Sequence, residues 1–467
     1  MVKLYFCRMR KNANKGILLY AISDYAAALL SWFCFFIFRK TYIEHISISI
    51  SEILHDTKFV YGLLLIPVFW LGYYFFSNTY FSVLKKSRLG ELFRTGIQAF
   101  IGGIILFFSL MLNDIIKGYQ DYYFLFFGFL ILHFFITAFF RISVLSFIKT
   151  QIENGKISIP TLLVGTQSNC EKIEQEIKTS KIKLPYTVVD RVILDESDAG
   201  NSFKKIQHFN FEDVILALGN VSTQTIENHI IYFLNKGKTV QILPDELDIL
   251  SGKFKTQSIF GSPLIEIPTD LMTPWEKITK RLADILLSIF GLLLLSPILL
   301  VVALKVKRSS KGSIFFLQDR VGLNGNLFSI IKFRSMIENA ENGTPRLSSE
   351  NDERITPFGK TMRKYRIDEL PQLWNVLKGD MSLVGPRPER KFFIDQIIQT
   401  APQYQLLQRV KPGITSLGMV KFGYASTVEE MHQRMRYDLL YIENISFLMD
   451  VKILIYTAMI LWKGKGK

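Results

Sequence analysis

The chain has 467 residues, of which 49% are hydrophobic, and it carries a formal net charge of +15. This length allows several domains, and so apolar a composition, with 39 phenylalanines, points to membrane segments and argues against an ordinary soluble enzyme. The first and last thirds are basic and the middle third is acidic. Basic surface beside apolar segments suits anionic lipid headgroups and phosphorylated substrates, and no nucleic-acid-binding motif is present. The three cysteines and six histidines are scattered, which predicts neither disulfides nor a metal cluster.

Four apolar segments occur before residue 150: Ile17–Phe38, Phe59–Phe76, Ile97–Leu112 and Tyr122–Phe140. Lys and Arg gather before the first segment and between the second and third, and none occurs in residues 41–57. By the positive-inside rule, both ends of this unit lie in the cytoplasm. We therefore predict a four-helix transmembrane bundle over residues 1–150. Asp24 and His133 fall inside these segments, where we expect them to form interhelical bonds.

Residues 151–270 have a different pattern, in which short apolar runs alternate with polar helical stretches. The expected strands are Ile157–Val164, Thr187–Leu194, Val214–Leu218 and Thr239–Leu243. This alternation predicts a parallel, Rossmann-like α/β domain in the cytoplasm. The residues after Gly165 lack the further glycines that a dinucleotide pyrophosphate requires, so the nucleotide loop is degenerate. A structural or assembly role is favoured over cofactor binding.

The last part, residues 271–467, begins after the linker Gly261–Pro274 with the apolar segment Ile285–Leu304. Its 20 residues are enough to span a bilayer. However, Ser296-Pro297 interrupts it, and both flanks are basic. Proline kinks a helix, and positive charge on both sides fits a re-entrant helix that returns to the cytoplasmic face. A kinked span is the alternative.

A β-hairpin follows this segment. Two alternating strands, Ile314–Arg320 and Leu327–Phe333, flank a turn that contains Asn324-Gly325. The hairpin carries Arg320 toward the basic run Lys332–Met336. Near the end of the sequence, the apolar stretch Ile445–Trp462 contains two charges, which favours an interfacial helix over a span. The remainder of this domain is predicted to be mainly helical.

Two adjacent carboxylates, Asp368 and Glu369, stand just before Pro371. Proline at this point is typical of the first position of a helix, and Gly379 is typical of its end. The simplest interpretation of Asp368 is therefore an N-cap. Four cations in the neighbouring motifs favour a different interpretation of the pair. A carboxylate pair among Lys and Arg suits magnesium-assisted phosphoryl transfer. These cations are Arg320, Lys332, Arg334 and Arg387.

Several ordered motifs between residue 280 and the C-terminus resemble the bacterial sugar transferase family, the monotopic phosphoglycosyl transferases. The matching pieces are Lys280-Arg281 with Asp284, Ser296-Pro297, Phe316–Arg320, Lys332–Met336, Asp368–Pro388 and Lys411–Thr415. The large members of this family also have a Rossmann-like domain, often with a degenerate loop, before the catalytic part. The resemblance implies transfer of a sugar phosphate from a UDP-sugar to a polyprenyl phosphate, undecaprenyl phosphate in bacteria, with release of UMP.

The resemblance also implies roles for individual residues. Asp368 is the nucleophile that forms an aspartyl phosphosugar, and Glu369 holds Mg²⁺. The expected contacts to phosphate and nucleotide are Lys332, Arg334, Arg387 and Arg320. The implied setting is the first membrane step of exopolysaccharide, capsule or O-antigen synthesis, at the cytoplasmic face of the bacterial inner membrane, with a homodimer possible. Residues 416–419 depart from the family pattern, so the sugar stays open.

Two other classes of function remain. A membrane-bound nucleotide-sugar oxidoreductase or dehydratase would use the middle domain, but it requires the glycine loop that is missing. A non-catalytic membrane scaffold would fit the four apolar segments. It gives no reason for a carboxylate pair among arginines and lysines.

Overall fold

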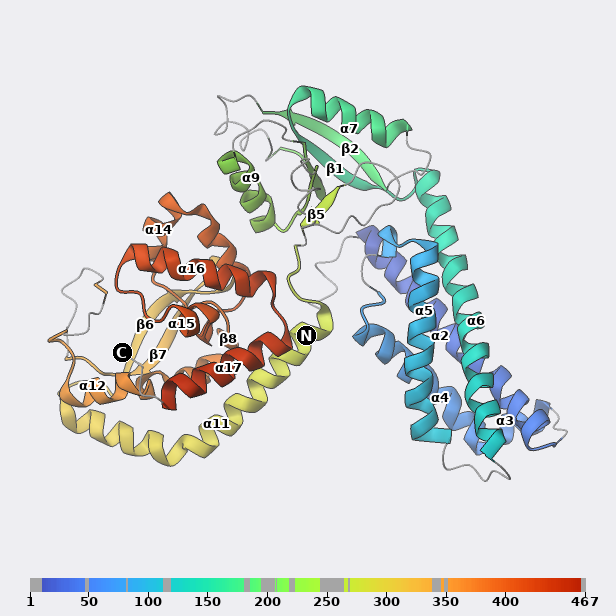
Figure 1. Ribbon diagram of the computed structural model, residues 1–467, viewed down its shortest axis with the longest axis horizontal. Helices are drawn as coiled ribbons and strands as arrows, with labels where there is room; N and C mark the ends of the chain where they lie inside the picture. Colours follow the sequence, from blue (N-terminus) through green and yellow to red (C-terminus); the bar gives the residue numbers. More distant parts are fainter. Residues whose placement is uncertain are drawn as a thin grey trace. The chain divides into compact units, whose positions relative to one another are not determined.

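The computed structural model describes residues 11–46, 50–80, 83–111, 119–179, 185–194, 206, 208–217, 223–243, 264–267, 269–337, 346–347 and 352–462. Its secondary structure is mostly helical (Figure 1). The chain forms two compact units. The first contains Met1–Gly219 and Ile242–Ile265, and the second contains Asn220–Gln241 and Glu266–Lys467.

Long apolar helices make up most of the first unit. They are α2 (Lys11–Phe38), α4 (Thr57–Phe76), α5 (Arg88–Leu106) and α6 (Tyr119–Glu153). Short segments join them: η1 (Arg39–Ile43), α3 (Ile50–His55), η2 (Val83–Lys85) and η3 (Phe107–Met111). Helix α2 packs on α4 and α6, and α5 packs on α4 and α6. Large aromatic side chains such as Trp70 and Phe129 fill the space between them, while many outward Leu and Phe side chains are exposed.

Five helices in the described part of the chain are long and apolar enough to cross a membrane, these four and α11 (Pro274–Ser309). The chain is therefore a membrane protein. The third helix is longer than the sequence predicted, because it begins at Arg88 rather than Ile97, where the Ser87 side chain accepts a hydrogen bond from the Gly90 amide.

Polar side chains inside these helices bond across helix boundaries, as predicted for Asp24 and His133. The guanidinium of Arg141 donates to both carboxylate oxygens of Asp24, at 2.7 and 3.1 Å. His133 Nε2 lies 2.9 Å from the hydroxyl of Tyr74. Glu91, which the sequence patterns did not single out, is buried 3.3 Å from Arg141. Within hydrocarbon such pairing offsets the cost of burying charge.

A five-stranded sheet has the order β2-β1-β3-β4-β5. Its strands are β1 (Ile159–Gly165), β2 (Tyr186–Ile193), β3 (Asp213–Ala217), β4 (Thr239–Ile242) and β5 (Ile265–Ile267), with helices α7 (Gln167–Thr179) and α9 (Thr223–Asn235). Strand β1 pairs in parallel with β2 and β3. The four predicted strands are present, and β5 lies within the predicted linker. A Cβ at Gly165 would lie 2.1 Å from the carbonyl oxygen of Ala217, so packing alone requires this glycine.

Most of the second unit consists of the elements that follow the linker. In chain order they are α11, β6 (Phe315–Val321), η4 (Leu323–Gly325), β7 (Leu327–Phe333), α12 (Pro357–Lys364), η5 (Ile367–Glu369), α13 (Gln372–Lys378), β8 (Ser382–Val384), α14 (Lys391–Thr400), η6 (Pro402–Arg409), β9 (Gly413–Thr415), α15 (Leu417–Lys421), α16 (Val428–Glu443) and α17 (Phe447–Trp462). Strands β6 and β7 form the predicted antiparallel hairpin, and β8 pairs with β9 in parallel. The main core lies between α14, η6 and α16.

Helix α11 continues through Pro297 and is bent (Figure 1). The Ser296 hydroxyl donates to the carbonyl of Leu293 at 2.8 Å, the acceptor that the missing proline N–H would have used. Both ends of α11 contact the same unit. Near its start, Asp284 accepts from the amide of Leu383, and near its end Val306 is buried in a small apolar cluster. The apolar residues between them are largely exposed.

Candidate active site

The carboxylate pair lies in η5, the tight turn that leads into α13. Asp368 and Glu369 are only 7% and 4% exposed. Arg366, at the start of this turn, has the left-handed backbone angles φ 53° and ψ 27°, which cost a non-glycine residue about 1 kcal/mol. Helix α13 has Pro371 at its N-cap and ends at Gly379, whose φ is 98°. No side chain caps α13, so the interpretation of Asp368 as an N-cap is wrong.

Glu369 is the centre of an ion-pair cluster. Lys332, from β7, donates to its Oε1 at 2.8 Å, and Arg387, from the loop after β8, donates to the same oxygen at 3.1 Å. Burial tends to raise the pKa of Glu369, but the charges of Lys332 and Arg387 outweigh burial and hold that pKa below its usual range. Glu369 therefore keeps its negative charge at neutral pH.

Asp368 lies in a different electrostatic environment. Burial and the neighbouring charge of Glu369 raise the pKa of Asp368, against the opposing effect of Lys332, Arg363 and Arg387. A carboxylate with little solvation is a stronger nucleophile than one held by strong hydrogen bonds, because fewer hydrogen bonds have to break before its oxygen attacks. The two neighbouring carboxylates therefore differ: two cations hold Glu369 in its charged form, whereas the pKa of Asp368 is raised.

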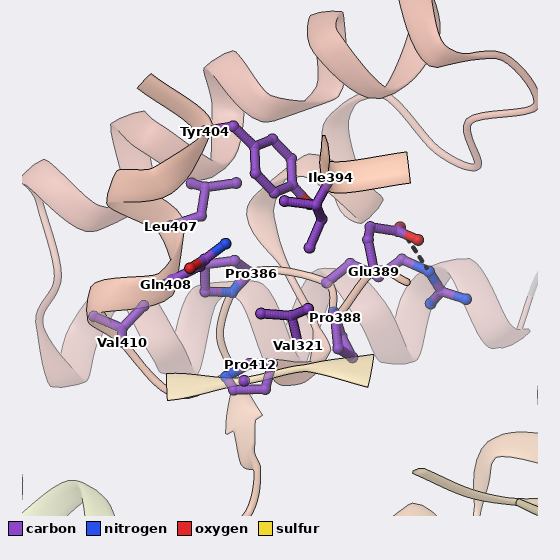
Figure 2. A pocket seen from close by; sticks show the side chains of 12 residues that line it. Val321, Pro386, Pro388, Glu389, Ile394, Tyr404, Leu407, Gln408, Val410 and Pro412 are labelled. Carbon is purple, nitrogen blue, oxygen red and sulfur yellow. Dashed lines mark ion pairs between the residues drawn. The ribbon is translucent and has the colours of Figure 1, made fainter. Parts of the chain in front are cut away.

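Arg387 also lies near another carboxylate, that of Glu389, which is 4% exposed. It accepts hydrogen bonds from Arg434 at 2.7 Å and from Arg320 at 2.9 Å, and Arg387 Nε lies 3.9 Å away. Figure 2 shows Glu389 beside a small cleft whose other side is formed by Tyr404 of η6. The network joins β6, the Arg387 loop and α16. Glu389 was not among the residues predicted from the sequence, although its position directly after Pro388 was a usable signal.

The predicted phosphate-binding cations do not all meet at the pair. Lys332 and Arg387 contact Glu369 directly, as described above. Arg320 instead binds Glu389 and the carbonyl of Pro388, one layer behind Arg387. Arg334 is buried at the end of α11, where it donates to the carbonyl of Ser310 at 2.7 Å. The structure therefore brings Arg334 to the membrane helix rather than to the carboxylates.

An aromatic side chain that the sequence analysis missed lies beside the pair. The ring of Tyr424, in the segment between α15 and α16, has the guanidinium carbons of Arg366 and Arg387 each 4.9 Å from its centroid. Nothing in the sequence links these three positions, since they are brought together only by the fold.

Residues of the other motifs hold the elements next to the carboxylate pair in place. Asp284 of α11 accepts hydrogen bonds from Ser382 and Leu383 in β8 at 3.1 and 2.9 Å. Arg281 donates to two carbonyls at the end of α13, at 2.6 and 2.8 Å. Strand β9, within Lys411–Thr415, pairs with β8. Helix α11 thus fixes the two elements that follow the carboxylate pair, α13 and β8.

The candidate protein ligands for a metal ion are the two carboxylates themselves. Among the described residues, no three His, Cys, Asp or Glu side chains form a cluster that could hold a metal ion. Mg²⁺ commonly binds through one or two carboxylates together with substrate phosphates and waters. Both cations on Glu369 bind Oε1, and Oε2 takes part in neither bond. The pair therefore fits an ion that binds together with a diphosphate.

The family model for bacterial sugar transferases matches residues 275–464. The chain is 39% identical over 219 residues to a UDP-N-acetylgalactosamine-undecaprenyl-phosphate N-acetylgalactosaminephosphotransferase of Aeromonas hydrophila, covering 47% of this chain and 51% of that relative. It is 38% identical over 235 residues to a UDP-glucose:undecaprenyl-phosphate glucose-1-phosphate transferase of Klebsiella pneumoniae, covering 50% of each. The alignment therefore spans about half the length of both relatives.

A smaller relative is matched almost completely. The exopolysaccharide production protein ExoY of Sinorhizobium fredii is 33% identical over 233 residues, which is 46% of this chain and 99% of that protein. The residues that the family model matches include the carboxylate pair. The chain belongs to the bacterial sugar transferase family.

Proposed function

We propose that the chain is a membrane phosphoglycosyl transferase, which moves a sugar-1-phosphate from a UDP-sugar to a polyprenyl phosphate. One observation carries the proposal: two buried carboxylates stand side by side, one held by Lys332 and Arg387 and the other with a raised pKa. A nucleophile next to fixed charges suits phosphoryl transfer. The relatives named after UDP-sugar and undecaprenyl-phosphate substrates support the same reaction.

In the first half-reaction, a carboxylate oxygen of Asp368 attacks the β-phosphorus of the UDP-sugar. The bond from that phosphorus to the bridging oxygen breaks, and UMP leaves with the oxygen. Asp368 then carries the sugar phosphate as an acyl phosphate. Lys332 and Arg387, which lie around Glu369, provide positive charge where the phosphate oxygens gain negative charge.

In the second half-reaction, a phosphate oxygen of the polyprenyl phosphate attacks the same phosphorus. The bond to Asp368 breaks, the carboxylate is regenerated, and the product is a polyprenyl diphosphate sugar. Mg²⁺, held by Glu369 with Asp368 adjacent, would neutralise charge on the diphosphate when it is bound. Glu369 itself remains ionised throughout, because its two cations stay in place.

The exposed middle of α11 supports a re-entrant membrane helix. Both ends of α11 bond to the same compact unit, while Leu293 and Phe290 in between are 71% and 63% exposed. A helix that crossed the bilayer would carry its ends to opposite sides. We take the four earlier helices as a transmembrane bundle and the sheet as a Rossmann-like domain. The carboxylates then face the cytoplasm of the bacterial inner membrane, where UDP-sugars are made.

The orientation can be measured with single cysteines in a cysteine-free variant. Lys311, just after α11, and Lys360 on α12 are exposed and lie outside the site, so each is replaced singly by cysteine. Both should resist membrane-impermeant thiol reagents in intact cells and react after permeabilisation. Labelling of either in intact cells would contradict the re-entrant arrangement.

The activity is tested by donor profiling with the full chain in membranes. A panel of UDP-sugars is supplied with and without undecaprenyl phosphate, and UMP release is measured. Lipid-dependent release from at least one donor is expected, glucose and N-acetylgalactosamine donors being natural first choices. Asp368→Asn should abolish release and Asp395→Asn, an exposed carboxylate on α14, should not. No UMP release from any donor would contradict the proposal. The product would begin an exopolysaccharide, capsule or O-antigen chain.

A further inference from the structure

Tyr424 joins two arginines that border the carboxylate pair. Arg366 precedes the pair in the same turn, and Arg387 comes from the loop after β8. Each guanidinium carbon lies 4.9 Å from the centroid of the Tyr424 ring, within the range of a cation–π interaction. Gly423, with φ of 96°, makes the turn that precedes the tyrosine. The ring therefore connects the segment with the nucleophile to the segment with its main cation.

The two arginines differ in what else they contact. Arg387 is engaged by Glu369 at 3.1 Å. Arg366 has no carboxylate within ion-pair distance among the residues that the structure describes, and its Nε is buried without a hydrogen-bond partner. A buried donor of this kind calls for a partner, which a bound anion can supply. Among the described residues, Arg366 is thus a cation of this site whose charge is not engaged in a direct ion pair.

The backbone at Arg366 supports the same conclusion. Its left-handed angles of 53° and 27° are unfavourable for a residue with a long side chain. Strain of this kind persists where the surrounding structure enforces it and is concentrated at functional sites. Here it occurs two residues before Asp368, in the conformation that has the guanidinium on the Tyr424 ring.

The balance of charge identifies the class of ligand. Around the two carboxylates, the nearby cations are Lys332, Arg363, Arg366 and Arg387. Positive charge exceeds negative charge before substrate binds. A diphosphate restores the balance, and guanidinium groups bind phosphate through charge-assisted hydrogen bonds.

We propose that Arg366, held by the ring of Tyr424, binds the diphosphate of the nucleoside diphosphate donor, and that Tyr424 is a positioning residue for both arginines. The proposal rests on the proposed function, because it names the group that receives the donor. Arg366 contacts the diphosphate directly. Tyr424 acts through the two arginines and needs only its aromatic ring.

The test measures UDP binding to the full chain in detergent, with UMP as the comparison. Arg366→Asn removes the guanidinium, and asparagine tolerates positive φ, so no strain is added. The dissociation constant for UDP should rise about 10-fold or more, as expected for the loss of one charge-assisted hydrogen bond. UMP, which lacks the β-phosphate, should lose less affinity. Lys364→Asn, an exposed cation in the same segment, is the matched control and should bind UDP as the wild type does.

Tyr424 is tested by two substitutions. Tyr424→Phe keeps the ring and should bind UDP nearly as tightly as the wild type, while Tyr424→Leu should weaken binding. The combination of Tyr424→Leu with Arg366→Asn should cost less than the sum of the two single changes, since they act through one contact. In turnover, these changes should raise the KM for donor and leave the KM for polyprenyl phosphate unchanged, which a general loss of folding would not do.

The two proposals fail in different ways. Unchanged UDP affinity in Arg366→Asn, or equal losses in Tyr424→Phe and Tyr424→Leu, would overturn this inference even if the wild type releases UMP from a UDP-sugar. If the wild type binds UDP through Arg366 but releases no UMP from any donor, this binding role stands and the transferase reaction is contradicted.

Discussion

Replacing Glu389 with glutamine should destabilise the second unit strongly. Glu389 is 4% exposed and accepts hydrogen bonds from Arg434 at 2.7 Å and Arg320 at 2.9 Å. Loss of its charge leaves these arginines buried without a counter-ion, a change that costs about 3–5 kcal/mol in comparable pairs. Glutamine keeps one acceptor oxygen, so we expect about 3 kcal/mol. In a unit of this size that corresponds to a fall of about 6–12 °C in Tm.

The assay is thermal unfolding of the full chain in detergent, with Asp395→Asn as the control because this carboxylate is exposed on α14. The pH dependence provides a second readout. Burial tends to raise the pKa of Glu389, but Arg434, Arg320 and Arg387 together hold it below the ordinary 4.5. The stabilisation is therefore fully present above that pH and is lost as pH falls through the folded-state pKa, where wild type and variant should converge. A Tm of Glu389→Gln equal to that of the control would refute the reasoning.

Three further predictions concern the other parts of the chain. Replacing Ser296 and Pro297 with leucine should straighten α11, so that part of the population spans the bilayer. That part is measured by the labelling of a cysteine placed just after α11 in intact cells, and transferase activity should fall in proportion to it. Gly165→Ala should lower the free energy of unfolding of the first unit by about 1–3 kcal/mol, because its Cβ would lie 2.1 Å from a backbone oxygen of β3; an unchanged thermal transition would contradict this close packing. Because burial and the charge of Glu369 raise the pKa of Asp368, the acid limit of the first half-reaction should lie above the ordinary aspartate value of 3.8. Glu369→Gln should move that limit to lower pH, and a shift to higher pH would count against the assigned coupling.

Local patterns in the sequence predicted the individual elements well. The four strands of the sheet follow from apolar runs of strand length, and the β6–β7 hairpin follows from alternation around Asn324-Gly325. The end of α13 at Gly379 was also predicted, because glycine adopts positive φ without strain. These features depend on residues near one another in the chain. The start of α5 was missed because its first turns are polar and only the Ser87 cap identifies them.

The candidate site was predictable in part. The carboxylate pair and two of its cations, Lys332 and Arg387, were identified from motifs, and the structure brings them together. The positions of Arg320 and Arg334 could not be inferred, because a cation in a motif can serve either the substrate or a neighbouring helix. Tyr424 was missed for a similar reason: its role depends on three segments that meet only after folding.

The most direct test of the reaction is isolation of the covalent intermediate. Purified full chain is incubated with a UDP-sugar labelled at the β-phosphate, without lipid acceptor, and the labelled peptide is identified by mass spectrometry. We expect label on Asp368, loss of label on addition of undecaprenyl phosphate, and no label in Asp368→Asn. Label retained in Asp368→Asn, or sugar transfer that proceeds without any labelled protein, would contradict the assignment of Asp368 as the nucleophile.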